Sequence, residues 1–444
     1  MTIAAAFAKF ALDSCFEAIP PRAIEHAKFV IASTIASAAS GRDIESARAF
    51  RELARERGGT PQATLWFDAG PKLPVMDAAR ANAIMSDAAA SDDTDLAAHA
   101  HLGTVTSATA IAMAERERAS GRDLLAAVVL GYEVGHRIGE RIEPADAGFH
   151  PGVITIFAAT VAAARLMKLT PAQMTQAIAL AATSIGGNRA AANISCARDY
   201  DAALSSMLAV TAAMSAARGM TAAAEVFEMP RGYFDVFGGR NIENIADGLG
   251  ESWGIVDDLA IKLMPGAWIN HALAEAAWTC AIEGDIKPEQ VARITAQTRR
   301  SPRHLLYHPT DLTGVAHSLP YMVAAAIVDR SYSWQHVEPG KFMDPLIGAL
   351  QDKVAASDEA SPYASRGGGT LTITLHDGRS FSRTFEAPPG SGPRGIERAD
   401  IEAKYRALTR QGGMSEQNIA KSLEIIHRLD EAASVSSLMD LLHL

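Results

Sequence analysis

Alanine-rich segments with helical spacing follow one another from about residue 20 to residue 250, and this pattern most restricts the possible fold. No alternation typical of strands stands out there. Apolar residues make up 48% of the 444 residues but aromatic residues only 6%, a composition that suits closely packed helices. Thr170 and Gln173 flank a proline in a capping-box pattern, which predicts a helix beginning at Thr170. We therefore predict a mainly α-helical protein.

The pattern changes after about Asp257. Residues 291–298 alternate in the manner of a strand, and residues 370–385 predict a β-hairpin that turns at Asp377-Gly378. Helical spacing resumes near the C-terminus. We predict a large all-helical domain into which a smaller α+β domain is inserted. The predicted bounds are 1–256 and 396–444 for the helical domain and 257–395 for the α+β domain.

The net charge and the length of the apolar segments indicate which partners and which cellular location to expect. The chain has 41 Lys and Arg against 51 Asp and Glu, a net charge of −10, which disfavours binding to nucleic acid or to an anionic membrane. The longest weakly polar run, residues 153–164, is shorter than the roughly 18 residues that span a bilayer. The N-terminus lacks the basic start of a signal peptide. We expect a cytoplasmic protein with no nucleic-acid or membrane partner, whose anionic ligands bind a local basic cluster.

Motifs for common cofactors are missing from the sequence. It contains no GxxxxGK[ST], no GxGxxG after a strand, no GxSxG and no HExxH. Cys15, Cys196 and Cys280 lie far apart, so no CxxC pair can hold zinc or an iron–sulfur cluster. We expect no cofactor and no metal. Acid–base chemistry on a small substrate needs only a few placed side chains.

An acidic cluster followed by two histidines is the first candidate site. Asp92 and Asp93 precede His99 and His101, and carboxylates and imidazoles this close can share protons. The same residues also fit a solvated loop ahead of a helix at residues 104–115. As a metal site, His99-x-His101 with nearby aspartates is a weak match, because no fourth ligand is evident.

Other candidate residues lie in otherwise apolar segments. His150 begins an apolar helix, whose dipole favours the neutral imidazole; a packing histidine is the alternative. Arg198, with Arg189 nine residues earlier, can bind a carboxylate or form a surface ion pair with Asp199 or Asp201. Lys262 lies at the predicted domain junction. Tyr321 can transfer a proton or be buried with a satisfied hydroxyl.

Taken together and in this order, these segments resemble the MmgE/PrpD family, which includes 2-methylcitrate dehydratase, cis-aconitate decarboxylase and iminodisuccinate epimerase. The resemblance runs from about Ile19 to Leu429. The phrases that carry it are Asp92-Asp93-Thr94, His101-Leu102-Gly103, Gly131-Tyr132-Glu133-Val134, Gly148-Phe149-His150-Pro151, Lys262-x-x-Pro265 and Ser318-x-x-Tyr321. It implies a large helical domain, a smaller α+β domain, a cleft between them, a cofactor-free reaction on a small polycarboxylate, and a homodimer.

The chain departs from the family pattern at two positions. The family's histidine and tyrosine positions are occupied by His101, His150 and Tyr321. Ala90 stands where an acidic residue is expected, three positions before Asp93, and Arg198 replaces a lysine common in dehydratase and decarboxylase members. Arginine holds an anion but does not shuttle a proton. The resemblance therefore implies a site that removes and returns a proton more readily than it expels a leaving group.

We predict a cofactor-independent epimerase or racemase that acts at a carbon next to a carboxylate of a small dicarboxylate such as iminodisuccinate. Inversion needs one acid–base group on each face. We expect His101, supported by Asp93, to be one group and Tyr321 or His150 to be the other. The predicted substrate-binding residues are Arg198, Lys262 and Arg189. The alternatives are a 2-methylcitrate-type dehydratase, a cis-aconitate-type decarboxylase, and a non-catalytic protein that binds a polycarboxylate.

Overall fold

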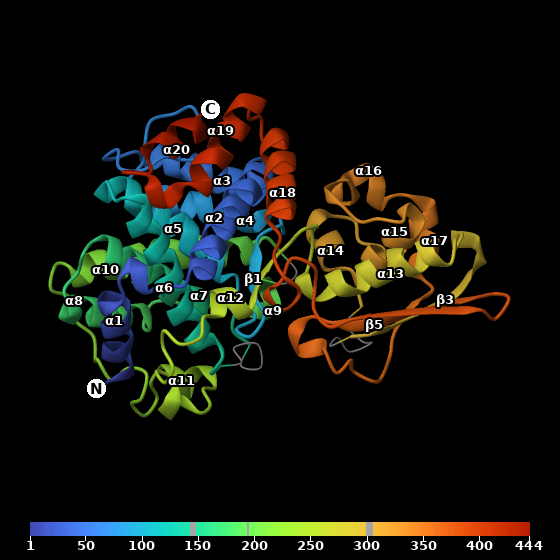
Figure 1. Ribbon diagram of the computed structural model, residues 1–444, viewed down its shortest axis with the longest axis horizontal. Helices are drawn as coiled ribbons and strands as arrows, with labels where there is room; N and C mark the ends of the chain where they lie inside the picture. The colour runs from blue at the N-terminus through green and yellow to red at the C-terminus, as the bar shows by residue number, and fades with distance from the viewer. Residues whose placement is uncertain (143–147, 193–194, 299–304) are drawn as a thin grey trace. The chain divides into compact units, whose positions relative to one another are not determined.

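The computed structural model describes residues 1–142, 148–192, 195–298 and 305–444 (Figure 1). Contacts within the chain divide it into two compact units. Unit 1 consists of Met1–Leu259 and Glu397–Leu444, and unit 2 consists of Ala260–Ile396. Unit 1 therefore includes both ends of the chain.

Unit 1 is built mainly from α-helices, as predicted. Its longer helices are α1 (Ile3–Asp13), α2 (Pro21–Gly41), α3 (Glu45–Arg57), α4 (Val75–Ala88), α5 (Leu102–Glu117), α6 (Gly121–Gly139), α7 (Gly152–Leu166), α8 (Pro171–Ala181), α10 (Ala197–Ala216), α18 (Arg398–Gln411) and α19 (Glu416–His427). Shorter ones are α9 (Arg189–Ala192), α11 (Tyr233–Phe237), α12 (Gly254–Asp257) and α20 (Ser436–Leu442). Asp93–Asp95 form the strand β1. The sequence does not predict this strand, because three residues are too few to show alternation.

Helices α5, α6 and α7 form the buried centre of unit 1. Every residue of α7 except Arg165 is buried, and α5 and α6 are buried over most of their length. Small residues allow the backbones to approach closely. A Cβ at Gly131 of α6 would lie 2.4 Å from the carbonyl oxygen of Ala158 on α7. The alanine-rich sequence therefore forms helices that pack at close range.

The helix start predicted at Thr170 is confirmed. Thr170 Oγ1 accepts a hydrogen bond from the N–H of Gln173 (3.3 Å), and Gln173 Oε1 accepts one from the N–H of Thr170 (3.0 Å). These bonds satisfy amides that have no partner within α8.

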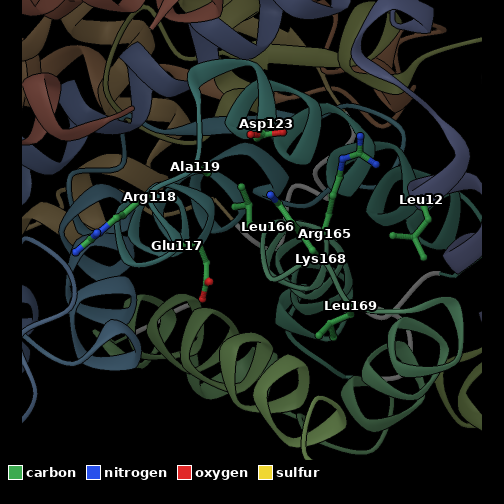
Figure 2. Close-up of a pocket in the computed structure, with 9 residues that line it drawn as sticks. All are labelled: Leu12, Glu117, Arg118, Ala119, Asp123, Arg165, Leu166, Lys168 and Leu169. Carbon is green, nitrogen blue, oxygen red and sulfur yellow. The ribbon is translucent and has the colours of Figure 1, made fainter. Parts of the chain in front are cut away.

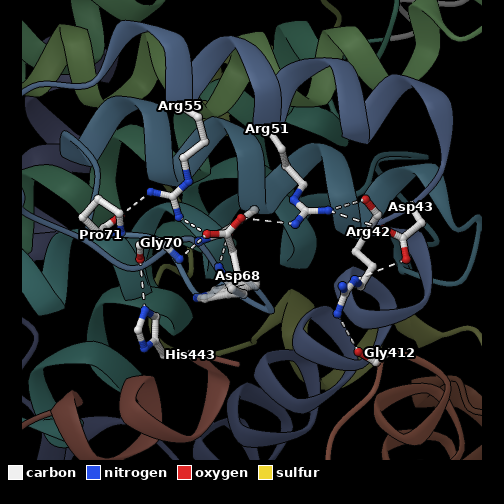
Figure 3. Close-up of polar contacts among 11 residues, drawn as sticks. Arg42, Asp43, Arg51, Arg55, Asp68, Gly70, Pro71, Gly412 and His443 are labelled. Atoms are coloured by element: carbon white, nitrogen blue, oxygen red, sulfur yellow. Dashed lines mark hydrogen bonds and ion pairs between the residues drawn. The ribbon is translucent and has the colours of Figure 1, made fainter.

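Polar contacts tie the C-terminal segment to the residue after α2 and to the loop after α3 in unit 1 (Figure 3). Arg51 and Arg55 of α3 both pair with Asp68. Nε2 of His443, after the last helix, lies 3.0 Å from the carbonyl oxygen of Gly70. A second tie lies after α18, where Nη1 of Arg42 donates to the carbonyl oxygen of Gly412 at 2.8 Å. Residues after 396 thus belong structurally with the first part of the chain.

Unit 2 contains a four-stranded sheet and several helices. The strand order is β4 (Val354–Ala356), β3 (Val291–Gln297), β5 (Gly369–Leu375) and β6 (Ser380–Phe385), and β2 (Leu259–Ile261) spans the boundary with unit 1. Strand β3 pairs parallel with β4 and antiparallel with β5. The helices are α13 (His271–Glu283), α14 (Leu312–His317), α15 (Leu319–Asp329), α16 (Pro339–Phe342) and α17 (Pro345–Gln351).

The hairpin predicted at residues 370–385 is confirmed. Strands β5 and β6 pair antiparallel, and Gly378 in the turn has a φ of 88°, which glycine adopts without strain. The side chains of Leu371, Ile373 and Leu375 alternate with polar residues and are buried in the core of unit 2. In the part of the chain that the structure describes, none of the helices combines the length and the apolar character needed to cross a membrane.

Candidate active site

Asp93 lies at the N-terminal end of α5. Its Oδ2 accepts a hydrogen bond from the N–H of Gly103 (2.7 Å), and its Oδ1 accepts one from the N–H of Thr104 (2.7 Å). A Cβ on Gly103 would lie 2.7 Å from Asp93 Oδ2, so a glycine is needed there. Burial, and then the neighbouring Asp92 carboxylate, raise the pKa of Asp93 to about 6. Asp93 is therefore a helix cap.

His101 directly precedes α5, and the carboxylate at its ring belongs to Asp92. Nδ1 of His101 lies 2.6 Å from the carbonyl oxygen of Asp93 and 2.9 Å from Oδ2 of Asp92. The expectation that the Asp93 side chain supports His101 is corrected accordingly. Because a carbonyl oxygen only accepts, Nδ1 carries a proton and Nε2 is the nitrogen whose protonation can change. The side chain is 19% exposed, so solvent reaches it.

His150 lies just before α7 and stays neutral. Its Nδ1 accepts a hydrogen bond from the N–H of Gly152 (3.2 Å), which places the ring proton on Nε2. Asp201 Oδ2 is 3.5 Å from Nδ1. Burial, followed by the positive charges of Arg198, His101 and Arg189, lowers the pKa of His150 to about 3. The lowered pKa agrees with the neutral state that we predict from the sequence. The ring is suited to donate a hydrogen bond rather than to accept a proton.

Arg198 forms a buried ion pair across unit 1. Its Nη2 lies 3.2 Å from Oδ1 of Asp87, which lies in the last turn of α4. Their side chains are 10% and 2% exposed. Burial lowers the pKa of Arg198, but Asp87, Asp92 and Asp199 outweigh burial and raise it, so the guanidinium is charged. The alternative of a surface ion pair with Asp199 or Asp201 is wrong, because the pair is buried and its acid is Asp87.

Further aspartates surround this ion pair. Ser46 of α3 donates a hydrogen bond to Oδ2 of Asp199 at 2.6 Å. Burial, and then the charge of Asp87, raise the pKa of Asp199 to about 7 and that of Asp201 to about 6. Buried carboxylates repel one another strongly because little water screens them. We expected a mainly basic cluster, but the described residues around Arg198 in unit 1 are mainly acidic.

Asp87 and Ser46 are not singled out by any sequence motif. Asp87 lies three residues before Ala90, where the family pattern has an acidic residue. Helix α4 ends at Ala88 and Ala90 has a φ of 49°, so helical spacing does not relate the two positions and no sequence signal pointed to Asp87. Ser46 and Asp199 are 153 residues apart, and no local pattern connects them.

Asp87, Asp92 and His101 form a group that can hold a metal ion. Each offers one ligand atom, and these atoms lie within 4.8 Å of one another. Carboxylates and an imidazole suit a divalent cation, but Arg198 already supplies a positive charge to Asp87. The grouping also differs from the His99-x-His101 pattern considered from the sequence. That the site works without metal stays a prediction.

Lys262 and Tyr321 belong to unit 2. Lys262 follows β2 and is 3% exposed. Tyr321 lies in the first turn of α15, and its hydroxyl donates to the carbonyl oxygen of His336 at 2.5 Å. Burial raises the pKa of Tyr321. Its hydroxyl proton is therefore engaged with the backbone, and the prediction that Lys262 and Tyr321 act together with His101 stays a prediction.

Figure 2 shows a cavity of about 360 Å³ in unit 1. It lies at the ends of α5 and α7 that are opposite to His101 and His150. It is lined by Leu12, Glu117, Arg118, Ala119, Asp123, Arg165, Leu166, Lys168 and Leu169. Glu117 ends α5, whereas His101 precedes it. A helix of 16 residues is about 24 Å long. This cavity is therefore separate from the predicted site residues.

The sequence matches known proteins along most of its length. Residues 5–244 match the MmgE/PrpD N-terminal domain and residues 265–431 match the MmgE/PrpD C-terminal domain. The chain is 26% identical to the cis-aconitate decarboxylase of Aspergillus terreus, in a match that covers 96% of this chain and 92% of that protein. It is 22% identical to the cis-aconitate decarboxylase of Homo sapiens, with 95% and 90% covered.

Proposed function

This chain belongs to the MmgE/PrpD family, and on that premise we propose that it is a lyase that decarboxylates a small tricarboxylate of the cis-aconitate type. The relatives named cis-aconitate decarboxylase support this class of reaction. Breaking the bond to the departing carboxylate leaves an electron pair on the carbon skeleton and releases CO₂. One proton must then form a C–H bond. Nε2 of His101 donates it, and solvent restores it.

The number of proton carriers is the observation that carries the proposal. Nδ1 of His101 lies 2.9 Å from Oδ2 of Asp92, and we assign the transferred proton to the other ring nitrogen, Nε2. His150 has a pKa of about 3 and stays neutral, and the hydroxyl of Tyr321 donates to a backbone carbonyl. Decarboxylation needs one proton donor, whereas inversion needs one group on each face. Inversion would need His150 or Tyr321 as the second proton carrier, and these observations support neither residue in that role.

Arg198, Arg189 and Lys262 are proposed to hold the remaining carboxylates. A guanidinium suits this role because it stays charged and presents several donors in a plane. His150 contributes a neutral N–H, which can bind a carboxylate or a developing negative charge without supplying a proton.

Epimerisation of an iminodisuccinate-like dicarboxylate is the second candidate function. It is favoured by Arg198, which replaces a lysine common in decarboxylase and dehydratase members, and by Ala90 in place of an acid. The same replacements weaken dehydration of a 2-hydroxy tricarboxylate as they weaken decarboxylation, but the relatives named above support decarboxylation.

Incubation with cis-aconitate in deuterated water tests the proposal. We expect CO₂ release and one deuterium in a new C–H bond of the product, measured by mass spectrometry. Parallel incubation with single stereoisomers of small amino- and imino-dicarboxylates tests the second candidate, which predicts deuterium exchange and appearance of the other isomer without CO₂. If the dicarboxylates exchange deuterium and no tricarboxylate releases CO₂, the proposed decarboxylation is wrong.

Tyr321→Phe separates the two functions further. If His101 is the sole proton carrier, we expect kcat to stay within about tenfold of the wild-type value, because the lost hydroxyl is bonded to a backbone carbonyl. General acid–base groups contribute roughly a hundredfold or more. A larger loss of kcat in a variant that melts normally would make Tyr321 a proton carrier and favour epimerisation.

A further inference from the structure

Lys404 is a buried lysine that the proposed mechanism does not use and that no motif singles out. It lies on α18 and is 3% exposed. Helix α18 packs against α2 in unit 1 (Figure 1). A buried ammonium group is unfavourable unless hydrogen bonds or opposite charges compensate for the lost water. The groups that Lys404 contacts therefore indicate why a lysine lies there.

Lys404 and α2 together hold one backbone carbonyl oxygen. Nζ of Lys404 donates to the carbonyl oxygen of Ser91 and to Oγ of Ser33 on α2, the second at 2.7 Å. Oγ of Ser37, one turn further along α2, donates to the same carbonyl oxygen at 2.9 Å. All three serines are buried. A carbonyl oxygen can accept two hydrogen bonds, so both acceptor positions of Ser91 are occupied.

Ser91 belongs to the segment that leads from α4 to strand β1. Helix α4 ends at Ala88, and Ala90 has a φ of 49°, in the left-handed region that residues with a side chain seldom adopt. Such a conformation persists only where surrounding contacts hold it. The two hydrogen bonds to the carbonyl oxygen of Ser91 come directly after this turn and supply such contacts. Lys404 therefore helps to fix the path of the backbone up to Asp92.

The residues after Ser91 provide both acceptors at Nδ1 of His101. Oδ2 of Asp92 lies 2.9 Å from Nδ1, and the carbonyl oxygen of Asp93 lies 2.6 Å from it. The carboxylate of Asp93 is in turn held by the amide groups at the start of α5. The backbone is thus anchored before Asp92 by the donors to Ser91 and after it by α5. The orientation of the His101 ring depends on both anchors.

We propose that Lys404 is a positioning residue for His101. By holding the carbonyl oxygen of Ser91, it keeps the two acceptors at Nδ1, and this fixes the direction in which Nε2 points. Lys404 transfers no proton itself. The inference rests on the proposed function in one respect, that His101 donates the proton that forms the new C–H bond. Without Lys404, the carbonyl oxygen of Ser91 loses one of its two donors, and the ring of His101 is held less firmly.

Lys404→Met tests the proposal by kinetics. Methionine has a similar length but carries neither a charge nor a donor. We expect kcat for CO₂ release from cis-aconitate to fall by about tenfold to a hundredfold, because small displacements of a catalytic group have effects of this size. KM should stay within about threefold, because the residues proposed to hold carboxylates lie outside the segment that Lys404 holds. Thermal melting verifies that the variant is folded at the assay temperature.

The same substitution in His101→Asn shows whether Lys404 acts through His101. We expect Lys404→Met to lower kcat by no more than about twofold in that background, because the group that it positions is already gone. A lysine that only stabilises the fold would lower kcat by the same factor in both backgrounds, and that result would overturn the proposal.

Lys28→Met is the matched control. Lys28 lies on α2, and its Nζ also ties α2 to the C-terminal segment, through the carbonyl oxygen of His427 at 2.8 Å and an ion pair with Asp430. These acceptors lie at and after the end of α19, not in the segment after α4. We expect kcat to stay within a few-fold of the wild-type value. Equal losses of kcat in the two lysine variants would contradict the positioning role.

Proton NMR of protein that contains ¹⁵N-labelled histidine gives a test that needs no reaction. At one fixed pH, the Nδ1 proton of His101, in a hydrogen bond of 2.6 Å, should give a downfield signal that is missing in His101→Asn. We expect this signal to move or broaden in Lys404→Met and to stay in place in Lys28→Met. An unmoved signal in folded Lys404→Met would show that the proposal is wrong. If the signal moves but the wild type releases no CO₂, the proposed function fails and the positioning role stands.

Ser37→Ala keeps the proposal testable if Lys404→Met does not fold. Ser37 is the other donor to the carbonyl oxygen of Ser91, and alanine removes this donor without removing a charge. We expect the signal of His101 to move in the same direction, with a smaller loss of kcat. In that case, an unmoved signal in Ser37→Ala would rule the proposal out.

Discussion

Replacing His101 with asparagine is expected to lower kcat by about a hundredfold to ten-thousandfold, the usual contribution of a general acid–base group. The asparagine amide can still donate to the carbonyl oxygen of Asp93, which lies 2.6 Å from Nδ1 of His101. It cannot release a proton. The measurement is kcat for CO₂ release from cis-aconitate, with thermal melting to verify folding.

His99→Asn is the matched control for this variant. His99 lies two residues before His101, and its φ of 52° is a conformation that asparagine adopts readily. We expect its kcat to stay within a few-fold of the wild-type value. Equal losses in the two variants would show that the effect comes from the fold of this segment, and an unchanged His101→Asn would remove His101 from the mechanism.

Replacing Asp95 with alanine is expected to lower the free energy of unfolding by about 3–5 kcal/mol, as for other broken buried ion pairs. Oδ2 of Asp95 lies 2.9 Å from Nδ1 of His136 on α6, and their side chains are 0% and 7% exposed. Oδ1 of Asp95 accepts hydrogen bonds from the N–H groups of Ala97 (3.0 Å) and Ala98 (2.7 Å). The alanine leaves these donors and a buried imidazolium without this partner. Urea unfolding measures the loss.

The pH dependence of stability distinguishes the ion pair from the lost hydrogen bonds. Burial lowers the pKa of His136, but Asp95 outweighs burial and raises it to about 10. A raised histidine pKa contributes stability that is fully present below its unfolded value of about 6.5 and is lost as the pH rises toward 10. Wild-type stability should therefore fall between about pH 7 and pH 10. Asp95→Ala should show a much smaller fall over this range.

Asp13→Ala is the control for a broken ion pair that is exposed. Asp13 pairs with Lys9 on α1, and their side chains are 60% and 63% exposed. Exposed pairs contribute little because water screens them, so this variant should unfold close to the wild type. A loss for Asp95→Ala no greater than that for Asp13→Ala would contradict the assignment of a buried ion pair.

Features decided by residues close together in the chain were predictable. Thr170 and Gln173 form the capping box three residues apart, and the hairpin at 370–385 follows from alternation and an Asp-Gly turn. The neutral state of His150 was also predicted, from its place at a helix start. The causes of its low pKa in the structure are burial and the charges of Arg198, His101 and Arg189, which come from distant segments.

Predictions about which side chains meet were less accurate, because sequence order does not give spatial partners. The carboxylate of Asp93 was expected to contact the His101 ring, but it caps α5 instead. The carboxylate that contacts the ring belongs to Asp92. Arg198 was expected to bind a ligand or a neighbouring aspartate, but its partner Asp87 lies 111 residues away.

By itself the sequence determined the mainly helical character of this protein, the helix start at Thr170 and the hairpin, because each depends on hydrogen bonds or apolar periodicity within a few residues. It also placed the chain in its family through short motifs in a characteristic order. Only the tertiary structure brought Ser46, Asp87 and Asp199 together around Arg198. Packing of α3, α4 and α10 buries these side chains. Because little water screens buried charges, each charged group shifts the pKa of its neighbours.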